Sequence, residues 1–373
     1  MWNSSPSCKH CHPDTGGEGG VTFDSFREQG AVMEGLMTTL REGTFVHAYL
    51  ISGMQGVGKK TLAGLMAQYL MCKAGNEDGG LLAGLSLPDI QKPCGVCSAC
   101  RQVRAGTHPD VIRVGGGVHI SPRPEDAKKA GIVVEDVREL VRIASTHTFE
   151  GGRRVIWLDQ ADTMNPQAQN ALLKTLEEPI AGTVFLLLTE KPDLLLPTII
   201  SRCRHIKLHP WPDDAVLRAL KHRDVPGERM QEALHVSGGS IGRALEIAVD
   251  EDYWQRRGEV MRDFFDLPGR SEIVRVSASW KDRKAQAGEL LDDVEDMLRT
   301  LMLVRLRRYG ASAVAGYPDA WRKMAEKADL SAFMRLLDAV REARKLKESQ
   351  VTWQAVVERL LLRLMEEKTR WST

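Results

Sequence analysis

Apolar runs alternate with helical patterns between residues 21 and 209 of the chain. Five runs are apolar almost throughout, which is typical of buried strands, and helical patterns lie among them. Strands are predicted at 47–53, 110–114, 153–159, 183–189 and 204–208, and helices at 59–72, 134–145 and 166–177. Strands that are apolar on both sides predict a parallel sheet with helices on both faces. We therefore expect an α/β core with a parallel five-stranded sheet, a class that binds nucleotides.

The pattern changes to all-helical beyond residue 210. Apolar residues recur there at three- and four-residue spacing, which predicts a small helical module over 210–250 and a larger one over 251–373. One apolar stripe in the last helix indicates either packing in a core or subunit contact, or a helix lying on a membrane surface. Its members are Trp353, Val356, Val357, Leu360, Leu361, Leu364 and Met365. Core or subunit packing is the simpler interpretation.

Composition narrows the classes of partner. At 373 residues, and roughly 150 residues per domain, two or three domains are expected. The 51 basic residues nearly balance the 50 acidic ones, so any contact with DNA must be local or made by partners. The first 20 residues are rich in Gly, Ser and Pro and predict a flexible tail without an apolar signal segment. We expect a cytoplasmic protein that does not bind a membrane.

The stretch SGMQGVGKKT, residues 52–61, predicts a phosphate cradle. Gly53, Gly56 and Gly58 allow a tight turn from a strand into a helix, and the N–H groups at a helix start can hold an anion. Lys59 can then reach the terminal phosphates. A glycine-rich turn without any ligand is the alternative, because the turn alone requires glycines.

Two groups that ATP hydrolysis needs are altered in the sequence. The position that normally holds a Mg²⁺-binding hydroxyl is Lys60, and Thr61 follows one residue late, about 100° around the helix. Asp159 ends a predicted strand, where a carboxylate can reach a magnesium shell through water. The next residue is Gln160, and an amide cannot act as a general base. We expect that ATP or ADP could bind without being hydrolysed, and the sequence gives little reason to expect a bound Mg²⁺ ion.

Four cysteines have the spacing of a metal site. Cys94, Cys97 and Cys100 form a C-x₂-C-x₂-C run, and Cys72 lies 22 residues upstream of it. Four thiolates are typical of tetrahedral structural zinc, whereas an iron–sulfur cluster and four unligated buried thiols are the alternatives. No position is left open for water, so a zinc ion would hold a loop rather than catalyse. The motif CKHCH at 8–12 has the spacing of a haem attachment or a metal site, but an unstructured tail explains it more simply.

Several stretches also carry a family resemblance, over about residues 23–247. They are HAYLISGMQGVGKKTLA, CGVCSACRQVRAGTHPDV, VIWLDQADTMNPQAQNALLKTLEEP, FLLLTEKPDLLLPTIISRCRHIKL and GGSIGRALE. Together they resemble the clamp-loader AAA+ ATPases of bacterial DNA polymerase III, and NALLKTLEEP and SRC are the most specific parts. The resemblance implies a P-loop α/β core followed by a helical lid and a helical collar.

The resemblance also implies partners and roles. Such a chain would join motor (gamma or tau) and delta subunits in a hetero-pentamer that places a sliding clamp on primed DNA. Arg202, in SRC, matches the family's arginine finger, which stabilises charge on the phosphoryl group at a neighbouring motor subunit. Thr189 matches the sensor-1 position and Arg243 the sensor-2 position.

The departures from the family's motor pattern indicate which kind of subunit this is. A motor would keep a hydroxyl after the cradle lysine and a Glu after the aspartate, but this chain has Lys60 and Gln160. A stator with little or no ATP hydrolysis of its own is therefore expected. Two alternatives stay open, an active motor-type ATPase and a zinc-containing DNA-binding module outside any ring.

Overall fold

The computed structural model describes residues 21–73, 93–123, 126, 131–149, 152–314 and 316–371. The chain divides into two compact units, Met1–Trp211 and Pro212–Thr373. The predicted tail at 1–20, with its CKHCH motif, lies outside the described residues, as does part of the segment between Cys72 and Cys94. The further division into lid and collar near residue 250 stays a prediction.

The first unit is built on a parallel five-stranded sheet, which confirms the predicted fold class. Its strand order is β2-β3-β4-β1-β5, and every neighbouring pair is parallel. The three inner strands are buried along their whole length, whereas the two edge strands are partly exposed. The strands are β1 (Ala48–Ser52), β2 (Val111–Val114), β3 (Arg154–Leu158), β4 (Thr183–Thr189) and β5 (Arg204–Lys207). Their carboxyl ends meet at one edge of the sheet, which is where such folds bind ligands.

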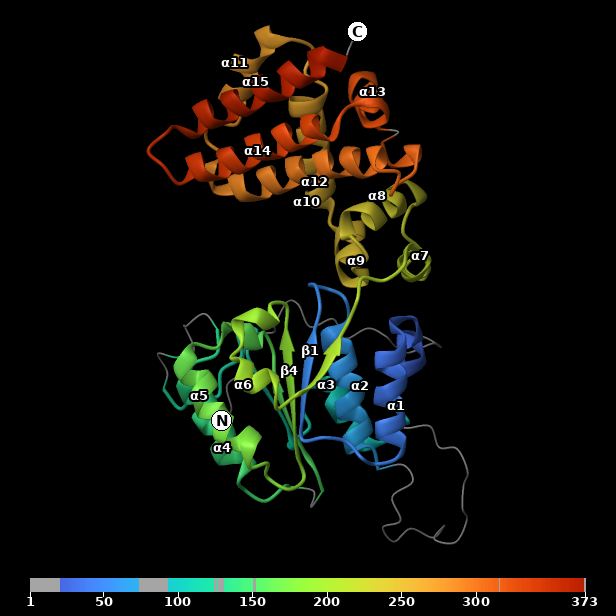
Figure 1. Ribbon diagram of the computed structural model, residues 1–373, viewed down its shortest axis with the longest axis vertical. Helices are drawn as coiled ribbons and strands as arrows, with labels where there is room; N and C mark the ends of the chain where they lie inside the picture. Colours follow the sequence, from blue (N-terminus) through green and yellow to red (C-terminus); the bar gives the residue numbers. More distant parts are fainter. Residues whose placement is uncertain are drawn as a thin grey trace, which may run out of the picture. The chain divides into compact units, whose positions relative to one another are not determined.

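Helices cover both faces of this sheet (Figure 1). One face carries α1 (Ala31–Arg41), α2 (Lys59–Met71) and α3 (Ser98–Ala105), and the other carries α4 (Val134–Ala144), α5 (Pro166–Glu177) and α6 (Pro197–Ile200). Apolar residues of α4 and α5, among them Leu140 and Leu172, pack in one buried cluster with Ile156 of β3 and Phe185 of β4. Short 3₁₀ turns complete the unit: η1 (Phe23–Gln29), η3 (Ala161–Thr163) and η4 (Pro192–Leu194).

The start of α5 is capped by its own sequence. The Asn165 side chain accepts a hydrogen bond of 2.8 Å from the backbone N–H of Ala168, which satisfies one of the free donors of the first turn. Pro166 takes the first helical position, where its missing N–H costs nothing. Because α5 lies between β3, which Asp159 follows, and β4, this cap helps to fix the edge of the sheet where the candidate site lies.

Replacing Asn165 with alanine is expected to destabilise α5 by about 1 kcal/mol, since the Ala168 N–H loses its partner. Hydrogen exchange of the α5 amides measures this as faster local opening. Asn170, exposed within the same helix, provides the matched control, because alanine there removes no cap and is a better helix former. Equal exchange rates in the two variants would contradict the capping role.

The second unit is entirely helical over the residues that the structure describes. Its elements are α7 (Asp213–Lys221), α8 (Gly227–Ser237), α9 (Ile241–Val249), α10 (Glu251–Val260), the π turn η5 (Met261–Phe265), η6 (Arg270–Glu272), α11 (Ile273–Ser279), η7 (Lys284–Gln286), α12 (Ala287–Arg305), η8 (Ala311–Val314), α13 (Asp319–Lys327), α14 (Leu330–Lys347) and α15 (Trp353–Trp371). Trp280 and Trp321 are fully buried in its core, and their indole N–H groups donate to Asp263 and to the carbonyl of Phe265. Among the described residues, none of the helices has the length and apolar character to cross a membrane.

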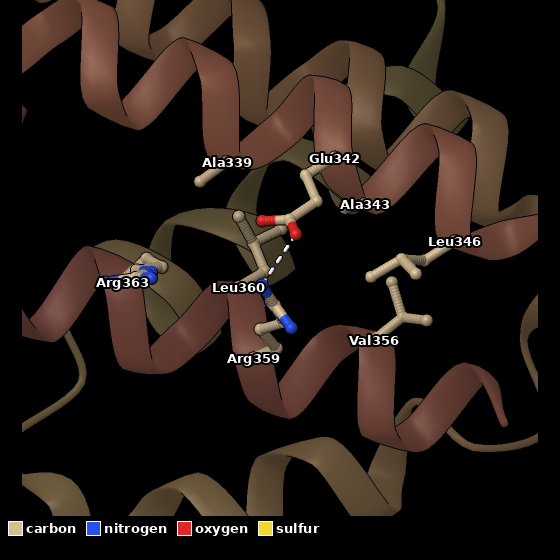
Figure 2. Close-up of a pocket in the computed structure, with 8 residues that line it drawn as sticks. All are labelled: Ala339, Glu342, Ala343, Leu346, Val356, Arg359, Leu360 and Arg363. Atoms are coloured by element: carbon tan, nitrogen blue, oxygen red, sulfur yellow. Dashed lines mark hydrogen bonds and ion pairs between the residues drawn. The ribbon is translucent and has the colours of Figure 1, made fainter. Parts of the chain in front are cut away.

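The apolar stripe of α15 packs inside this core. All seven of its residues are buried, which confirms core packing and rules out a helix that lays this stripe on a membrane. Figure 2 shows α14 beside α15, with Val356 and Leu360 of α15 directed toward α14. At the rim, Arg359 and Glu342 form an exposed ion pair of 2.6 Å across the two helices.

Candidate functional site

The loop between β1 and α2 has the backbone shape of a phosphate cradle. Gly53, Gly56 and Gly58 have φ angles of 153°, 70° and 108°, a region that favours glycine. A β-carbon on Gly53 would lie 2.8 Å from the backbone oxygen of Leu208, so no other residue fits there without movement. The loop leads directly into α2, whose first N–H groups lack helical partners and suit an anion.

Two aromatic residues that the sequence analysis did not single out hold this loop. Trp211 donates its indole N–H to the carbonyl of Val57 at 2.8 Å. The ring of Phe26 lies 3.2 Å from the place where a β-carbon on Gly58 would be, and its centroid is 5.6 Å from that of Trp211. Both come from segments far from the cradle in sequence, so only the fold shows their connection with it.

Lys59 is folded back onto the loop. Its ammonium group donates to the carbonyls of Gly53 and Met54 at 2.7 and 2.9 Å and lies 3.5 Å from a carboxylate oxygen of Glu190. Only 10% of the side chain is exposed. Burial lowers the pKa of Lys59, and the neighbouring Glu190 opposes that shift. All three ammonium hydrogens therefore have a partner or a nearby carboxylate.

Lys60 and Asp159 meet at the carboxyl edge of the sheet. The Lys60 ammonium lies 2.7 Å from Oδ2 of Asp159, which follows the end of β3. The Asp159 side chain is mostly buried, whereas Lys60 is two-thirds exposed and Thr61 is exposed at the next position of α2. A β-carbon on Gly116 would come within 2.7 Å of the same carboxylate oxygen, so the GGG stretch after β2 packs tightly against Asp159. Three successive glycines at a strand end were the available signal for that contact.

The residues that follow Asp159 and β4 form a second polar cluster at this edge. Gln160 has a left-handed backbone with φ of 53°, and η3 begins directly after it. Thr189, the sensor-1 candidate, is fully buried at the end of β4 and donates its hydroxyl to Asp162 at 2.7 Å. Glu190, next in sequence, is the residue that faces Lys59. The structure thus brings together the cradle, Asp159 and Thr189, as the sheet order requires.

Arg202 is presented by the turn after α6. Its guanidinium donates to the carbonyl of Thr198 at 2.9 Å and forms an ion pair of 2.7 Å with Glu177 at the end of α5. One third of the Arg202 side chain is exposed. The adjacent Cys203 is half-buried, and burial raises the pKa of its thiol to about 12. Glu177 is a partner that sequence spacing did not reveal.

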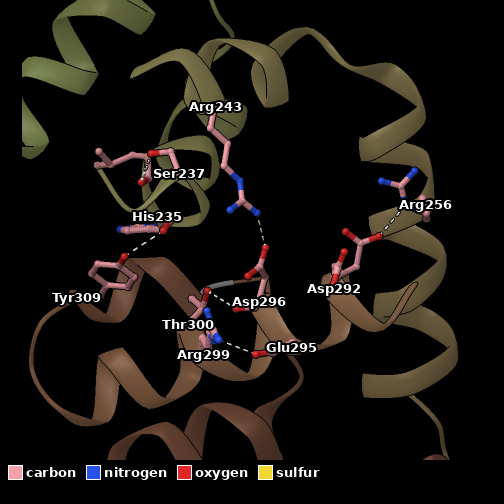
Figure 3. Close-up of polar contacts among 12 residues, drawn as sticks. His235, Ser237, Arg243, Arg256, Asp292, Glu295, Asp296, Arg299, Thr300 and Tyr309 are labelled. Atoms are coloured by element: carbon pink, nitrogen blue, oxygen red, sulfur yellow. Dashed lines mark hydrogen bonds and ion pairs between the residues drawn. The ribbon is translucent and has the colours of Figure 1, made fainter. Parts of the chain in front are cut away.

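Arg243, the sensor-2 candidate, lies in the second unit and is engaged there. Its backbone N–H donates to the hydroxyl of Ser240, which caps α9. Its guanidinium donates to Asp296 of α12 at 2.8 Å, as Figure 3 shows. Burial raises the pKa of Asp296, and Arg243 opposes this shift. Nearby, the Tyr309 hydroxyl donates to the carbonyl of His235 of α8. Arg243 therefore joins α9 to α12.

The four predicted thiols gather in one cluster. Cys72 follows the end of α2, Cys97 caps the start of α3 and Cys100 lies on its first turn, and Cys94 precedes them. One sulfur from each lies within 4.8 Å of the others, and Cys72 and Cys100 are buried. Tetrahedral zinc with bonds of about 2.3 Å requires similar spacing.

The donor set of this cluster fits zinc. Backbone N–H groups of Cys94, Cys97 and Cys100 donate to the sulfurs of Cys72, Cys94 and Cys97 at 3.4 to 3.5 Å. Burial by itself would raise the pKa of Cys97, but backbone donors from Cys100 and Lys73 favour its thiolate and bring that pKa to about 6. Thiolates held by N–H donors are soft ligands suited to zinc, and the ion would lie between α2 and α3.

The chain is similar in sequence to known replication proteins. Residues 28–212 match the family model described as DNA polymerase III, delta subunit. The DNA polymerase III subunit delta' of Pseudomonas aeruginosa is 41% identical over 199 residues, which are 52% of this chain and 53% of that relative, about half of its length. The subunit delta' of Escherichia coli is 29% identical over 330 residues, which are 88% of this chain and 90% of that protein.

Other relatives and solved structures match less specifically. The DNA polymerase III subunit tau of Salmonella typhimurium is 33% identical over 201 residues, which are 54% of this chain and 27% of tau. A gamma subunit-related protein of Thermotoga maritima has a TM-score of 0.43 and 15% identity, with 89% of this chain and 99% of that chain covered. The Escherichia coli subunit delta' aligns with 88% of this chain, whereas the Pseudomonas aeruginosa subunit delta' and tau each align with about half of it. The chain belongs to the clamp-loader family of DNA polymerase III delta' subunits.

Proposed function

We propose that this chain is a stator of the DNA polymerase III clamp loader, one that acts on a neighbour's ATP instead of hydrolysing its own. It would assemble with motor (gamma or tau) and delta subunits in a hetero-pentamer that places the sliding clamp on primed DNA. The observation that carries the proposal is the position of Arg202, which is one third exposed on the turn after α6 beside Cys203. Residues 210–250 would serve as the lid and 251–373 as the collar that joins subunits, in the cytoplasm.

The contacts of Arg202 suit a residue that acts on another subunit. Its partner Glu177 is itself about half exposed, and exposed ion pairs contribute only about 0–1 kcal/mol. The guanidinium can therefore leave Glu177 at little cost when a more strongly charged phosphate is offered. The guanidinium also donates to the carbonyl of Thr198, which holds the side chain at the turn. A guanidinium supplied in this way stabilises the charge of the transferring phosphoryl group.

The residues around the cradle support the absence of turnover. The position after Asp159 is Gln160, which offers no general base. The carboxylates close by are engaged, since Asp162 accepts from Thr189 and Glu190 faces Lys59. This combination favours a stator over the motor-type ATPase that the sequence left open. ATP or ADP could still occupy the cradle, and one structural zinc ion would bind the four thiols.

The purified full-length chain is expected to release phosphate from ATP only at background rates, with or without primed DNA. Mixed with motor subunits, the delta subunit and the clamp, it should be required for clamp loading onto primed DNA, which labelled clamp reports directly. A mixture that lacks this chain is the control. If the chain alone turned over ATP robustly and Lys59→Ala abolished that turnover, it would be a motor. A stable monomer that bound duplex DNA with a steep salt dependence and ignored the other subunits would be a separate DNA-binding module.

A further inference from the structure

The contact between Lys60 and Asp159 occupies the place where related nucleotide sites keep their magnesium ion. Lys60 stands at the helix position that otherwise supplies a hydroxyl to the metal, and Asp159 at the strand end that otherwise supplies a carboxylate. In this chain the two side chains touch, with 2.7 Å between Nζ and Oδ2. An ammonium group thus lies where the fold would place the metal's ligands.

The donor set does not fit magnesium. Mg²⁺ requires about six oxygen ligands at about 2.1 Å, and the helix offers an amine there instead of a hydroxyl. A divalent ion on the Asp159 carboxylate would lie within about 5 Å of the Lys60 ammonium, where the two positive charges repel. The exposed Thr61 is one residue further along α2. Lys60 and a magnesium ion are therefore alternatives at this carboxylate.

The charges of the cradle still suit phosphate binding, because Lys60 cancels Asp159. Glu190 likewise faces Lys59, whereas Asp162 accepts a hydrogen bond from the neutral Thr189 hydroxyl. An unpaired Asp159 would repel a phosphate chain, and neutralising it is one of the tasks that a metal performs. The ammonium of Lys60 performs the same task from within the chain.

Lys60 also keeps donors free for a ligand. Lys59 donates to two loop carbonyls and forms an ion pair with Glu190. Lys60 has one partner, Asp159, among the described residues. An ammonium group has three hydrogens, so two remain for phosphate oxygens. The side chain is two-thirds exposed and can shift without disturbing the core.

We propose that Lys60 takes the place of the magnesium ion, so that the cradle binds nucleoside di- or triphosphates without a divalent cation. Asp159 positions the ammonium group, while the loop and the start of α2 hold the phosphates through backbone N–H groups. This inference rests on the nucleotide-binding part of the proposed function and is independent of Arg202.

The test is a titration of the full chain with a fluorescent ADP analogue, once with EDTA and once with excess Mg²⁺. The wild-type dissociation constant is expected to agree within about twofold between the two conditions. Lys60→Thr restores the magnesium hydroxyl, so its affinity should fall about tenfold in EDTA and recover with Mg²⁺. Lys59→Ala should abolish binding in both conditions, and Lys174→Thr, at an exposed lysine of α5, should behave as wild type.

Three results would overturn the proposal. One is wild-type binding that tightens tenfold or more with Mg²⁺, a second is Lys60→Thr binding as tightly as wild type in EDTA, and the third is no binding by the wild-type chain at all. A raised melting temperature with ADP and EDTA gives an independent readout, and size-exclusion chromatography checks that each variant folds. None of these results bears on the arginine finger, which is measured at the neighbouring motor subunit.

Discussion

Replacing Arg202 with alanine is expected to slow ATP hydrolysis at the neighbouring motor site by about 10³-fold, the lower end of what an arginine finger contributes. The guanidinium would no longer stabilise the charge that develops on the transferring phosphoryl group. Pre-steady-state phosphate release by the reconstituted complex is the appropriate measurement, because it separates the slow site from motor sites that receive a finger from elsewhere. Clamp loading onto primed DNA should fall with it.

The controls for Arg202 separate its chemistry from its packing. Arg202→Lys keeps the charge but loses the planar fork of donors, so most of the rate should stay lost. Arg142 lies in an exposed ion pair with Glu139 on α4, and Arg142→Ala should leave the rate unchanged. Assembly should be intact in every variant, since the Arg202 pair with Glu177 is exposed. Normal ATPase and clamp loading in Arg202→Ala would refute the finger.

The strands and three helices of the first unit, α2, α4 and α5, could be predicted because burial leaves a clear pattern in the sequence. β4 is an example: all seven of its residues are buried, and TVFLLLT is apolar between its two threonines. The short helix α3 was not predicted, because it has only eight residues and much of its support comes from the thiol cluster at its start. The helix α1 and the four-residue helix α6 were not predicted either. A short element has too few residues to show a clear periodicity, and contacts with other parts of the fold hold it in place.

The candidate site could be predicted in its residues but not in its contacts. Cradle glycines and a strand-ending aspartate have sequence patterns with a physical cause, so their positions follow from the strand and helix boundaries. Lys60 pairs with Asp159 and Arg243 with Asp296, which are 99 and 53 positions away in the sequence. Each long side chain has several partners within reach, so the sequence alone does not show which pair forms. For Lys60 the sequence showed that a hydroxyl was missing, whereas the structure shows which group the lysine contacts instead.

Removing the metal from the four-thiol cluster is expected to have the largest effect on stability. Structural zinc contributes about 10–16 kcal/mol of apparent binding free energy in small domains, and here it would link the end of α2 to α3. Cys100 is fully buried on α3, so Cys100→Ser removes a ligand at the centre of that link. Metal analysis should find one zinc per wild-type chain and less in the variant. Hydrogen exchange over residues 93–106 should become fast in the variant, as it should in wild type treated with a strong chelator.

Cys203 provides the matched control for this experiment. Its thiol is half-buried and does not belong to the four-thiol cluster. Cys203→Ser should therefore keep one zinc and slow exchange in α3. If metal analysis found iron and sulfide in the wild-type chain, the thiols would hold an iron–sulfur cluster instead of zinc. If it found no tightly bound metal, they would be four reduced thiols. Because the parallel sheet has its own buried core, its strands should stay protected when α3 opens, which distinguishes loss of a metal-held segment from unfolding of the whole unit.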